Sequence, residues 1–343
     1  MKSVLIVTDA WHPQINGVVR SLERISEVLI ARGIEVLFLT PQEFRTVPMP
    51  GYGEIRLSIT TRRRVFRMIE AFGADAIHIA TEGPLGFIAR RYCIKHGLPF
   101  ATSYHTQFPE YLRARAPVPV GWGYRYLRRF HSAAKYCLVP TQSVADKLAF
   151  YGITNTVVWS RGVDLKLFNP DKRDSDETKF PWPRPIFLYV GRVAVEKNIE
   201  QFLKLDLPGT KLVVGDGPSR KTLEWRYPNA VFAGPKTGED LACHYASADC
   251  FVFPSRTDTF GLVLLEALAS GTPVAALPVT GPLDVIGSAP VGVLSNDLQA
   301  AAMQALTIPR AACRAHASQF SWEASADQFL RYLPAIKPAR MLA

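Results

Sequence analysis

Two carboxylates frame residues 254–273, the stretch whose residue types are best suited to bind a ligand. Asp258 and Glu266 stand eight positions apart, and Gly261 between them opens an apolar run at helical spacing, which predicts a helix start. Backbone N–H groups at a helix N-terminus bind oxygen anions, while carboxylates bind hydroxyl groups. The stretch therefore suits a polyol that carries a phosphate. An ordinary capped helix with two solvated acids is the alternative.

Two cations follow the strand expected at residues 186–190. Arg192 and Lys197 project from the loop that Gly191 begins. They suit a diphosphate because arginine offers a bidentate fork and lysine a compact charge. The alternative is a pair of surface cations balanced by Glu196.

Three further candidates lie in the first half of the chain. His105 follows the strand expected at residues 100–103, where it could bind a sugar hydroxyl or position charge; a histidine satisfied by local backbone is the alternative. Gly17 precedes a helix and permits close approach of an anion, although a plain tight turn fits as well. Glu110 is a possible acid or base, with a solvated helix start as the alternative.

Strands alternate with helices along the chain, which predicts parallel sheets covered on both faces. Further helices are expected at residues 21–32, 61–72 and 322–333. The strands are expected at residues 3–8, 35–40, 76–80, 100–103, 137–140, 186–190, 211–214, 230–233, 250–253 and 273–277.

The alternation of strands and helices is interrupted once, by a polar, Pro-rich stretch, so we expect two Rossmann-like domains. They span residues 1–168 and 185–318 and are joined by a linker at 169–184. Whether the helix within residues 319–343 returns to the first domain is left open. Ligands of open α/β sheets bind beyond the carboxyl ends of the strands, so the ligand is expected in a cleft between two facing domains.

Composition agrees with a globular chain of two domains. The 343 residues are 48% hydrophobic and 20% charged. The first apolar run is too short for a signal peptide, and no stretch has the roughly 18 uninterrupted apolar residues of a membrane span. Five cysteines without a Cys-x-x-Cys pair predict free thiols, no zinc and a reducing compartment. The lack of Gly-x-Gly-x-x-Gly and Gly-Lys-Ser/Thr argues against dinucleotide enzymes and P-loop NTPases.

The net charge of +10 belongs to the first half of the chain, since residues 1–170 hold 22 Lys and Arg against 12 Asp and Glu, and the remainder is balanced. Such a surface can face nucleic acid, an anionic membrane or an acidic substrate. No nucleic-acid module accompanies it. We expect an anionic membrane surface, with a solvated basic face and ordinary helix packing as the alternative. The residues expected to dock there are Arg62, Arg63, Arg64, Arg67, Trp122, Tyr124, Arg125, Tyr126, Arg128 and Arg129.

Taken together, the motifs resemble the family 4 retaining glycosyltransferases of GT-B fold, in the right order over nearly the whole chain. The narrower likeness is to the branch of α-mannosyltransferases and diacylglycerol glycosyltransferases, which include sulfoquinovosyl-diacylglycerol synthase. The motifs that carry the resemblance are Asn16-Gly17, residues 103–111, residues 161–164, Gly191-Arg192 with Glu196-Lys197, and residues 258–261 with Glu266.

The resemblance implies a role for each matching residue. Arg192 and Lys197 would hold the diphosphate and stabilise it as it leaves, and Glu266 would bind the ribose hydroxyls. His105 would contact the sugar near the reacting carbon, and Gly17 would close on the donor. The donor sugar and phosphate would be held by Asp258 and the amides of Thr259, Phe260 and Gly261. The family pattern commonly has glutamate where this chain has Asp258, so that position bears on which sugar is transferred.

The implied function is transfer of a hexose or hexuronic acid from a UDP- or GDP-sugar to a membrane lipid, diacylglycerol or a glycolipid. The reaction would retain configuration and require no cofactor or metal ion. The enzyme would be cytoplasmic, peripheral on the inner face of the cell membrane. The alternatives are a GDP-mannose-dependent α-mannosyltransferase that acts on a polysaccharide or soluble glycoside, a nucleotide-sugar 2-epimerase, and a sugar-binding module without transfer activity.

Overall fold

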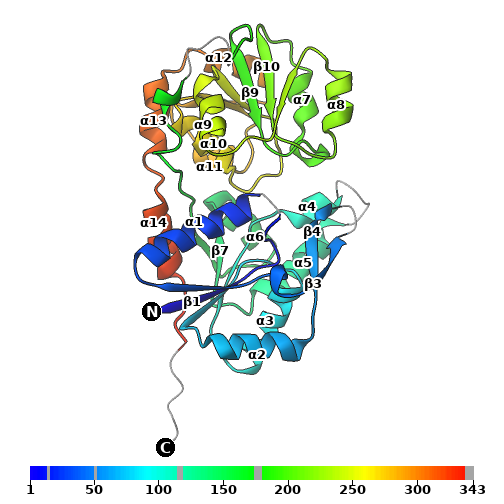
Figure 1. Cartoon of the computed structure of the whole chain (residues 1–343), viewed down its shortest axis with the longest axis vertical. Coiled ribbons are helices and arrows are strands. Elements are labelled where there is room, and N and C mark those ends of the chain that lie inside the picture. Colours follow the sequence, from blue (N-terminus) through cyan, green and yellow to red (C-terminus); the bar gives the residue numbers. More distant parts are fainter. Residues whose placement is uncertain (14–15, 50–51, 114–118, 174–179, 337–343) are drawn as a thin grey trace, which may run out of the picture. The chain divides into compact units, whose positions relative to one another are not determined.

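The computed structural model describes residues 1–13, 16–49, 52–113, 119–173 and 180–336 (Figure 1). The chain divides into two compact units, Met1–Arg161 with Trp322–Ala343, and Gly162–Ser321. Within the described residues each unit is built on a parallel six-stranded sheet, which confirms the predicted fold class. The expected linker at residues 169–184 lies partly outside the described residues.

The sheet of the first unit has the order β2-β1-β5-β6-β7-β8. Continuous apolar runs build its central strands, and the four residues from Val4 to Val7 are fully buried, as expected for strands covered on both faces. The strands are β1 (Ser3–Val7), β2 (Glu35–Leu39), β5 (Ala76–Ile79), β6 (Ala101–Ser103), β7 (Tyr136–Val139) and β8 (Thr156–Val158).

Two helix layers cover this sheet. One core cluster joins the sheet to α2, α3 and α5, and another joins it to α1 and α14. The helices are α1 (Gly17–Ala31), α2 (Arg62–Phe72), α3 (Pro84–Lys95), α4 (Phe108–Arg113), α5 (Val120–His131), α6 (Gln142–Phe150) and α14 (Trp322–Arg331), with a 3-10 turn, η1 (Pro41–Glu43). An antiparallel hairpin of β3 (Arg45–Met49) and β4 (Tyr52–Ile59) completes the unit, and the sequence did not predict it.

The sheet of the second unit has the order β11-β10-β9-β12-β13-β14. Its strand order reverses between β9 and β12, and this switch point is where open α/β sheets bind ligands. The strands are β9 (Ile186–Val190), β10 (Thr210–Val214), β11 (Val231–Gly234), β12 (Cys250–Phe253), β13 (Val274–Ala276) and β14 (Gly292–Leu294).

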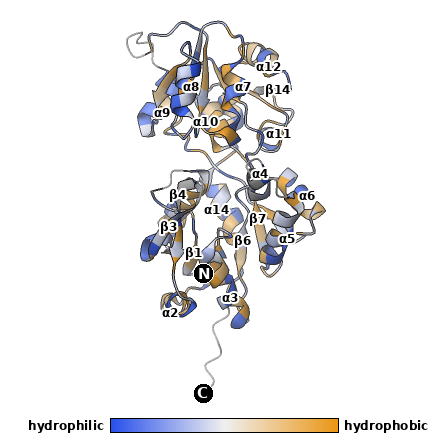
Figure 2. Ribbon diagram, turned by 90° about the vertical axis from the view of Figure 1, so that its right-hand side faces the viewer, coloured by the Kyte–Doolittle hydropathy of each residue, from blue (hydrophilic) through white to orange (hydrophobic). Residues whose placement is uncertain are grey.

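The helices of the second unit also form two layers. One core cluster includes α9, α10 and α13, and another includes α7, α8 and α12. Figure 2 shows α10 as predominantly hydrophobic, in keeping with its burial. The helical segments are η2 (Pro170–Lys172), η3 (Val195–Lys197), α7 (Ile199–Leu203), α8 (Arg220–Arg226), α9 (Gly238–Ser247), α10 (Leu262–Ala269), α11 (Pro282–Val285), α12 (Leu298–Ala305) and α13 (Arg310–Ala317).

The chain passes from one unit to the other twice, after Arg161 and after Ser321. In the first unit, the Trp159 indole donates to the hydroxyl of Ser325 at 3.0 Å, and that hydroxyl donates to the carbonyl of Ser160 at 2.7 Å. The chain that leaves the first unit and the chain that re-enters it are therefore hydrogen-bonded neighbours.

Candidate active site

The loop after β9 carries both predicted cations at the switch point of the second sheet. Position 215, after β10, requires glycine, because a Cβ added there would lie 1.9 Å from the carbonyl oxygen of Gly191. The backbone carbonyl of Arg192 accepts a hydrogen bond from Tyr189 at 2.8 Å, and its guanidinium lies 3.9 Å from the Glu196 carboxylate. Close packing of the strand ends thus fixes the start of the loop.

The loop after β12 is bound directly to the loop after β9. The Asn198 side chain donates to the Pro254 carbonyl at 3.0 Å, and the Thr257 hydroxyl donates to the Glu196 carbonyl at 3.2 Å. Lys197 and Asp258 form an ion pair across the two loops. The structure therefore brings these two predicted residues together and gives Lys197 a different partner from the Glu196 of the alternative reading.

Only one oxygen of Asp258 takes part in that ion pair. Its Oδ2 is buried and makes no hydrogen bond within the part of the chain that the structure describes. The two side chains are 22% and 18% exposed, so the pair is at the surface of the loops and yet partly shielded from water.

The predicted helix begins after Gly261 as α10. Gly261 has a φ of 84°, a left-handed conformation that glycine adopts without strain, and it precedes the first turn. Glu266 is only 7% exposed on this helix, and Tyr245 of α9 donates to its Oε2 at 2.8 Å. The structure thus places Thr259, Phe260 and Gly261 just before the start of α10. The Glu266 carboxylate lies within that helix and is held by Tyr245.

His105 follows β6 in the first unit and lies against two residues that come after β8. Its Nδ1 is 3.2 Å from a guanidinium nitrogen of Arg161, and its ring meets the Trp159 ring edge to face at 5.9 Å. Burial first, and then the charge of Arg161, lower the pKa of His105 well below its ordinary value. The imidazole is therefore neutral at physiological pH.

Comparison with known proteins identifies the chain. The profile "Glycosyltransferase Family 4" matches residues 15–167, and "Glycosyl transferases group 1" matches residues 184–308. A GDP-mannose-dependent alpha-mannosyltransferase of Mycobacterium tuberculosis is 32% identical, with 85% of this chain and 83% of the relative covered. The chain belongs to glycosyltransferase family 4. The predicted resemblance is confirmed.

Other relatives of this glycosyltransferase show the breadth of the family. A sulfoquinovosyl transferase of Arabidopsis thaliana is 33% identical over 82% of this chain and 60% of its own length. An alpha-monoglucosyldiacylglycerol synthase of Streptococcus pneumoniae is 26% identical over 94% and 82%. The solved structure of a sucrose-phosphate synthase from Thermosynechococcus elongatus has a TM-score of 0.74 at 22% identity, covering 96% of this chain and 98% of that one, and so shares the fold.

Gly17 is the first residue of α1 in the glycosyltransferase. Asn16 caps this helix, and its side chain accepts hydrogen bonds at 3.0 Å from the amides of Val18 and Val19. Gly17 is exposed beside this cap. It therefore stands at the N-terminus of a helix that begins four residues earlier than the predicted start at residue 21, and its role toward the donor stays a prediction.

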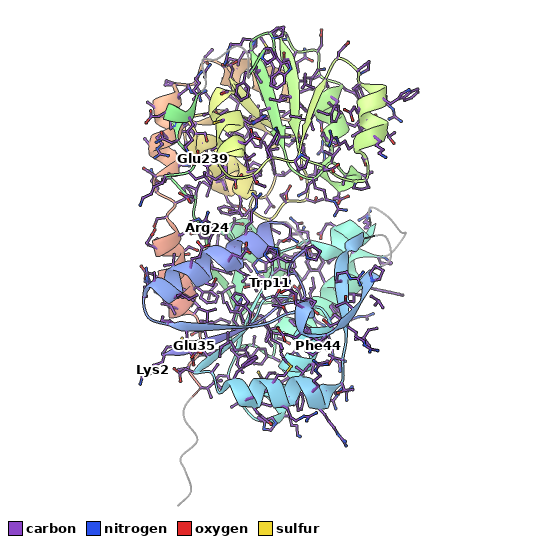
Figure 3. All side chains as sticks on the ribbon, viewed as in Figure 1. Lys2, Trp11, Arg24, Glu35, Phe44 and Glu239 are labelled. Atoms are coloured by element: carbon purple, nitrogen blue, oxygen red, sulfur yellow. The ribbon has the colours of Figure 1, made fainter. Side chains whose placement is uncertain are left out.

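The predicted basic residues lie on helices of a single layer of the first unit. Arg62, Arg63, Arg64 and Arg67 are exposed on α2, and α2 shares a core cluster with α3 and α5. Arg64 lies over the ring of Phe44 at 4.9 Å, a residue labelled in Figure 3. On α5 the exposed residues are Trp122, Arg125, Tyr126, Arg128 and Arg129.

Tyr124 was expected on this basic surface, and that prediction is wrong. It is 1% exposed, because it lies on the buried face of α5. Its ring stacks nearly parallel on the Tyr151 ring, with 3.6 Å between the ring centroids. A neighbouring arginine is also structural: the Arg90 side chain donates to the carbonyls of Phe130 and Arg129 at 2.8 and 2.6 Å, which ties α3 to the end of α5.

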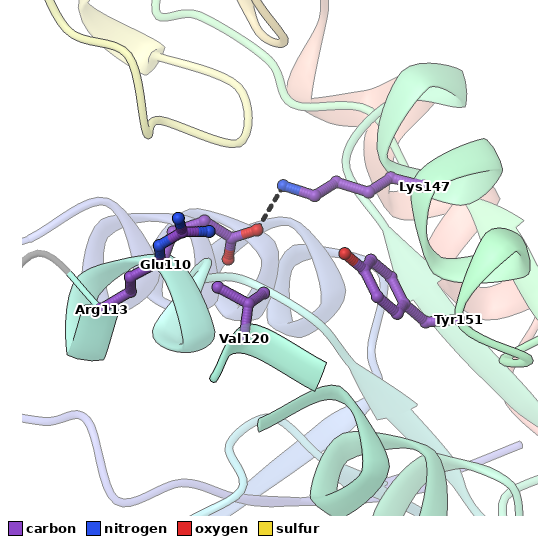
Figure 4. Close-up of a pocket in the computed structure, with 5 residues that line it drawn as sticks. All are labelled: Glu110, Arg113, Val120, Lys147 and Tyr151. Carbon is purple, nitrogen blue, oxygen red and sulfur yellow. Dashed lines mark ion pairs between the residues drawn. The ribbon is translucent and has the colours of Figure 1, made fainter. Parts of the chain in front are cut away.

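A pocket of about 560 Å³ opens beside α4, α5 and α6 (Figure 4). At its edge Lys147 lies 2.5 Å from the Glu110 carboxylate, which also accepts a hydrogen bond from Tyr124 at 2.7 Å. Glu110 is therefore held in a network and is not the solvated helix start of the alternative reading. The residues that line the pocket are Glu110, Arg113, Val120, Lys147 and Tyr151.

Sequence reasoning missed a buried acid at the end of the first strand. Asp9 is 5% exposed and accepts hydrogen bonds at 2.9 and 3.2 Å from the amides of Leu85 and Gly86 at the start of α3. Burial raises its pKa to about 6. The signal was present in the sequence, since Asp9 ends an apolar strand and Gly83 leaves room for it: a Cβ on Gly83 would lie 2.4 Å from the Asp9 carboxyl carbon.

The described part of the glycosyltransferase lacks both a metal-binding cluster and a membrane-spanning helix. No group of three or more His, Cys, Asp or Glu side chains there is arranged to hold a metal ion. No helix there has the length and apolar character needed to cross a bilayer. None of the five cysteines forms a disulfide.

Proposed function

We propose that the chain transfers a hexose or hexuronic acid from a UDP- or GDP-sugar to a membrane lipid, diacylglycerol or a glycolipid. The transfer would retain configuration, without a metal ion or other cofactor, at the cytoplasmic face of the cell membrane. Membership of family 4 supports sugar transfer. The activity of the Streptococcus relative, an alpha-monoglucosyldiacylglycerol synthase, supports a lipid acceptor.

The observation that carries the donor assignment is the joining of Lys197 to Asp258 at the switch point of the second sheet. Arg192 lies on the same loop as Lys197, and the start of α10 follows Asp258 directly. Two cations and helix amides act on the negative charge that grows on a departing diphosphate. These residues would thereby stabilise the transition state more than the donor in its ground state.

Asp258 is proposed to divide its carboxylate between two tasks. One oxygen pairs with Lys197 and would orient the ammonium toward the phosphate. The second, buried oxygen Oδ2 would accept a hydrogen bond from a hydroxyl of the donor sugar. Because aspartate is one methylene shorter than the glutamate common in the family, Asp258 would help to select the sugar.

Glu266 is proposed to bind the ribose hydroxyls of the donor. Its carboxylate is almost fully buried and already accepts one hydrogen bond from Tyr245, and a carboxylate has further acceptor capacity. His105 is proposed to contact the transferred sugar, and Gly17 to approach the donor phosphate.

A donor and acceptor screen tests the proposed reaction. The purified chain is incubated with UDP- and GDP-sugars and with vesicles that contain diacylglycerol or glycolipid, and the lipids are then analysed by mass spectrometry. A hexose or hexuronic acid added to a lipid, with retained configuration and unaffected by chelator, is the expected result. No product from any donor would refute the proposal.

A GDP-mannose-dependent α-mannosyltransferase that acts on a polysaccharide or soluble glycoside is the second candidate function. The 32% identity to a GDP-mannose-dependent alpha-mannosyltransferase favours its donor. Mannose transfer from GDP-mannose to a polysaccharide or soluble glycoside, independent of lipid, would establish it. A 2-epimerase would release no free nucleoside diphosphate in response to an acceptor, so release only on acceptor addition excludes that activity.

Membrane attachment is proposed to depend on the exposed arginines of α2 and α5 and on Trp122 of α5. Each cation near an anionic bilayer contributes about 1 kcal/mol. We predict that replacing Arg62 and Arg63 with glutamine weakens binding to anionic vesicles about 30-fold in a flotation assay at low salt.

The matched control replaces Lys204 and Lys221, two exposed lysines of the second unit, with glutamine and removes the same charge. Its binding is expected to match the wild type, and high salt should release both proteins. Absence of wild-type binding at low salt, or equal weakening by both double variants, would contradict the proposed surface.

A further inference from the structure

A buried arginine, Arg161, contacts the imidazole of His105. Arg161 follows β8 and is 3% exposed. Its guanidinium lies 3.9 Å over the Trp159 ring and donates to the Trp159 carbonyl at 2.6 Å. The other terminal nitrogen, Nη2, is 3.2 Å from Nδ1 of His105. Two anchors on Trp159 thus fix the direction in which the guanidinium meets the imidazole.

The chemistry of this contact determines where the imidazole proton resides. A guanidinium has five N–H donors and no acceptor, so Nδ1 of His105 must accept the hydrogen bond. An imidazole whose Nδ1 accepts, and which is neutral, carries its proton on Nε2. Protonation of Nδ1 would set two donors against each other and add a second positive charge in a buried place.

We propose that Arg161 is a positioning residue that holds His105 as the neutral Nε2–H tautomer, so that His105 donates a hydrogen bond to a substrate oxygen and does not act as a base. The tautomer follows from the geometry of the first unit alone. The identity of the substrate oxygen rests on the proposed function.

The surroundings of His105 favour the same state. The titratable or charged groups that lower its pKa include Arg161, His78 of β5 and His131 of α5. His78 is fully buried and lies 3.0 Å from the Ser103 hydroxyl, and burial, followed by the charge of Arg161, lowers its pKa to about 3. Arg161, His78 and His131 each disfavour a positive charge on the imidazole of His105.

Nitrogen NMR of the full-length chain without substrate tests the tautomer directly. Two other histidines serve as internal references, because each donates to a carbonyl from a known nitrogen. His244 has Nδ1 at 2.7 Å from the Asp240 carbonyl, and His316 has Nε2 at 2.8 Å from the Val285 carbonyl. The His105 signals, assigned by their loss in His105→Gln, should match the Nε2–H pattern of His316. The Nδ1–H pattern of His244, or a doubly protonated ring at neutral pH, would overturn the proposal.

Arginine variants test whether Arg161 imposes that state. In Arg161→Met the Nδ1–H tautomer should become populated and the pKa of His105 should rise, because the donor and its charge are both gone. Arg161→Lys keeps a cationic donor and should restore the Nε2–H pattern. An unchanged His105 signal in a folded Arg161→Met variant would overturn the role of Arg161. If Arg161→Met does not fold, Arg161→Lys together with the wild-type spectrum decides, and loss of the Nε2–H pattern in the lysine variant would also count against it.

Kinetics separate a hydrogen-bond donor from a base. Glutamine offers an N–H donor in nearly the same place as Nε2 and cannot take up a proton at neutral pH. On the donor and acceptor pair found in the screen, His105→Gln should keep kcat within about tenfold, whereas His105→Ala should lose about 100- to 1000-fold. Equal losses in both variants would overturn the donor role. If the screen finds no transfer, the proposed function fails while the NMR result still decides the tautomer.

Discussion

At the scale of single residues, the ion pair between Lys197 and Asp258 is the centre of the candidate donor site. Each side chain is about one fifth exposed, and a partly buried pair is less screened by solvent and salt than a fully exposed one. A phosphate that binds Lys197 has to compete with Asp258 for the ammonium. Asp258 thus holds the Lys197 ammonium in place before the donor binds, and such preorganised charge reduces the reorganisation needed during the reaction.

Replacement of Glu266 with alanine tests the ribose assignment. We predict a higher KM for the nucleotide sugar and a kcat/KM about 10- to 100-fold lower, because hydrogen bonds to a charged group contribute about 1.5–3 kcal/mol. Steady-state kinetics with varied donor measure this. Tyr245→Phe removes only the hydroxyl that donates to Glu266 and should have a smaller effect. Wild-type donor kinetics in Glu266→Ala would refute the assignment.

Asp9 predicts a pH dependence of stability. Its pKa is raised from 3.8 to about 6 by burial, so the folded state binds a proton more tightly than the unfolded state. Stability from this group is therefore fully present below pH 3.8 and is lost as pH rises to about 6, by about 3 kcal/mol in total. The difference in unfolding free energy between wild type and Asp9→Asn, measured across this range, should show that slope. A difference independent of pH would contradict it.

The positions of the candidate donor-site residues in the fold could largely be predicted from residue type and spacing, whereas the contacts between these residues could not. Arg192, Lys197, Asp258 and Glu266 stand after apolar strands or on a helix whose start Gly261 marks, and such local signals place them at the edge of the sheet. The pairing of Lys197 with Asp258 joins residues 61 positions apart. It depends on β9 and β12 being neighbours in the sheet, which no local pattern reveals.

At the scale of elements, α9 and α10 carry Tyr245 and Glu266, and one arginine of α13 holds the ends of both helices. Arg310 donates to the Ala246 and Ala248 carbonyls at 2.5 and 2.8 Å and to the Ser270 carbonyl at 3.0 Å. Helix ends leave carbonyls unsatisfied, so this guanidinium replaces water at two helix ends at once.

Arg310→Met should therefore destabilise the chain by about 3 kcal/mol, because several buried carbonyls lose their donor. Denaturant unfolding measures the loss. The control, Lys221→Met on the exposed face of α8, should change stability by no more than about 0.5 kcal/mol. Equal stability of the two variants would show that water satisfies these carbonyls instead.

The elements themselves were predicted unevenly, for physical reasons. Helices with an amphipathic face and a cap, such as α2 with Thr61 before it and Gly73 after it, were found almost to the residue. The short strands β8 and β14 and the β3–β4 hairpin were missed. The residues of β8 and β14 are only partly buried, whereas those of the equally short β6 and β13 are fully buried, so β8 and β14 lack a buried run that marks a strand. Pro48 within β3 masks a strand pattern because proline is rare inside sheets.

At the scale of the whole molecule, the last helix belongs to the unit in which the chain begins. Phe329 of α14 is fully buried and meets His78 at 4.9 Å and Trp159 at 5.0 Å between ring centroids. Helix α14 therefore helps to complete the core that includes Trp159, the residue against which Arg161 and His105 pack.

Phe329→Ala should destabilise the first unit by about 3–5 kcal/mol, as expected for a buried phenylalanine. Hydrogen exchange followed by mass spectrometry should show faster exchange in β1 and β5 to β8, and little change in β9 to β14. Glu323→Ala, on the exposed face of the same helix, is the control and should leave exchange unchanged. Uniform acceleration in both units would show that they unfold as one.

The hydrogen-bonded ends of the first unit have a consequence for its evolution and engineering. Because Ser160 and Ser325 touch, residues 162–321 form an insertion whose two ends meet the host at neighbouring points. Domain insertion is tolerated where the ends lie close together. The second unit can thus be regarded as an inserted domain: a short loop could replace it and leave the first sheet intact, and the corresponding unit of a homologue could be inserted at the same two points.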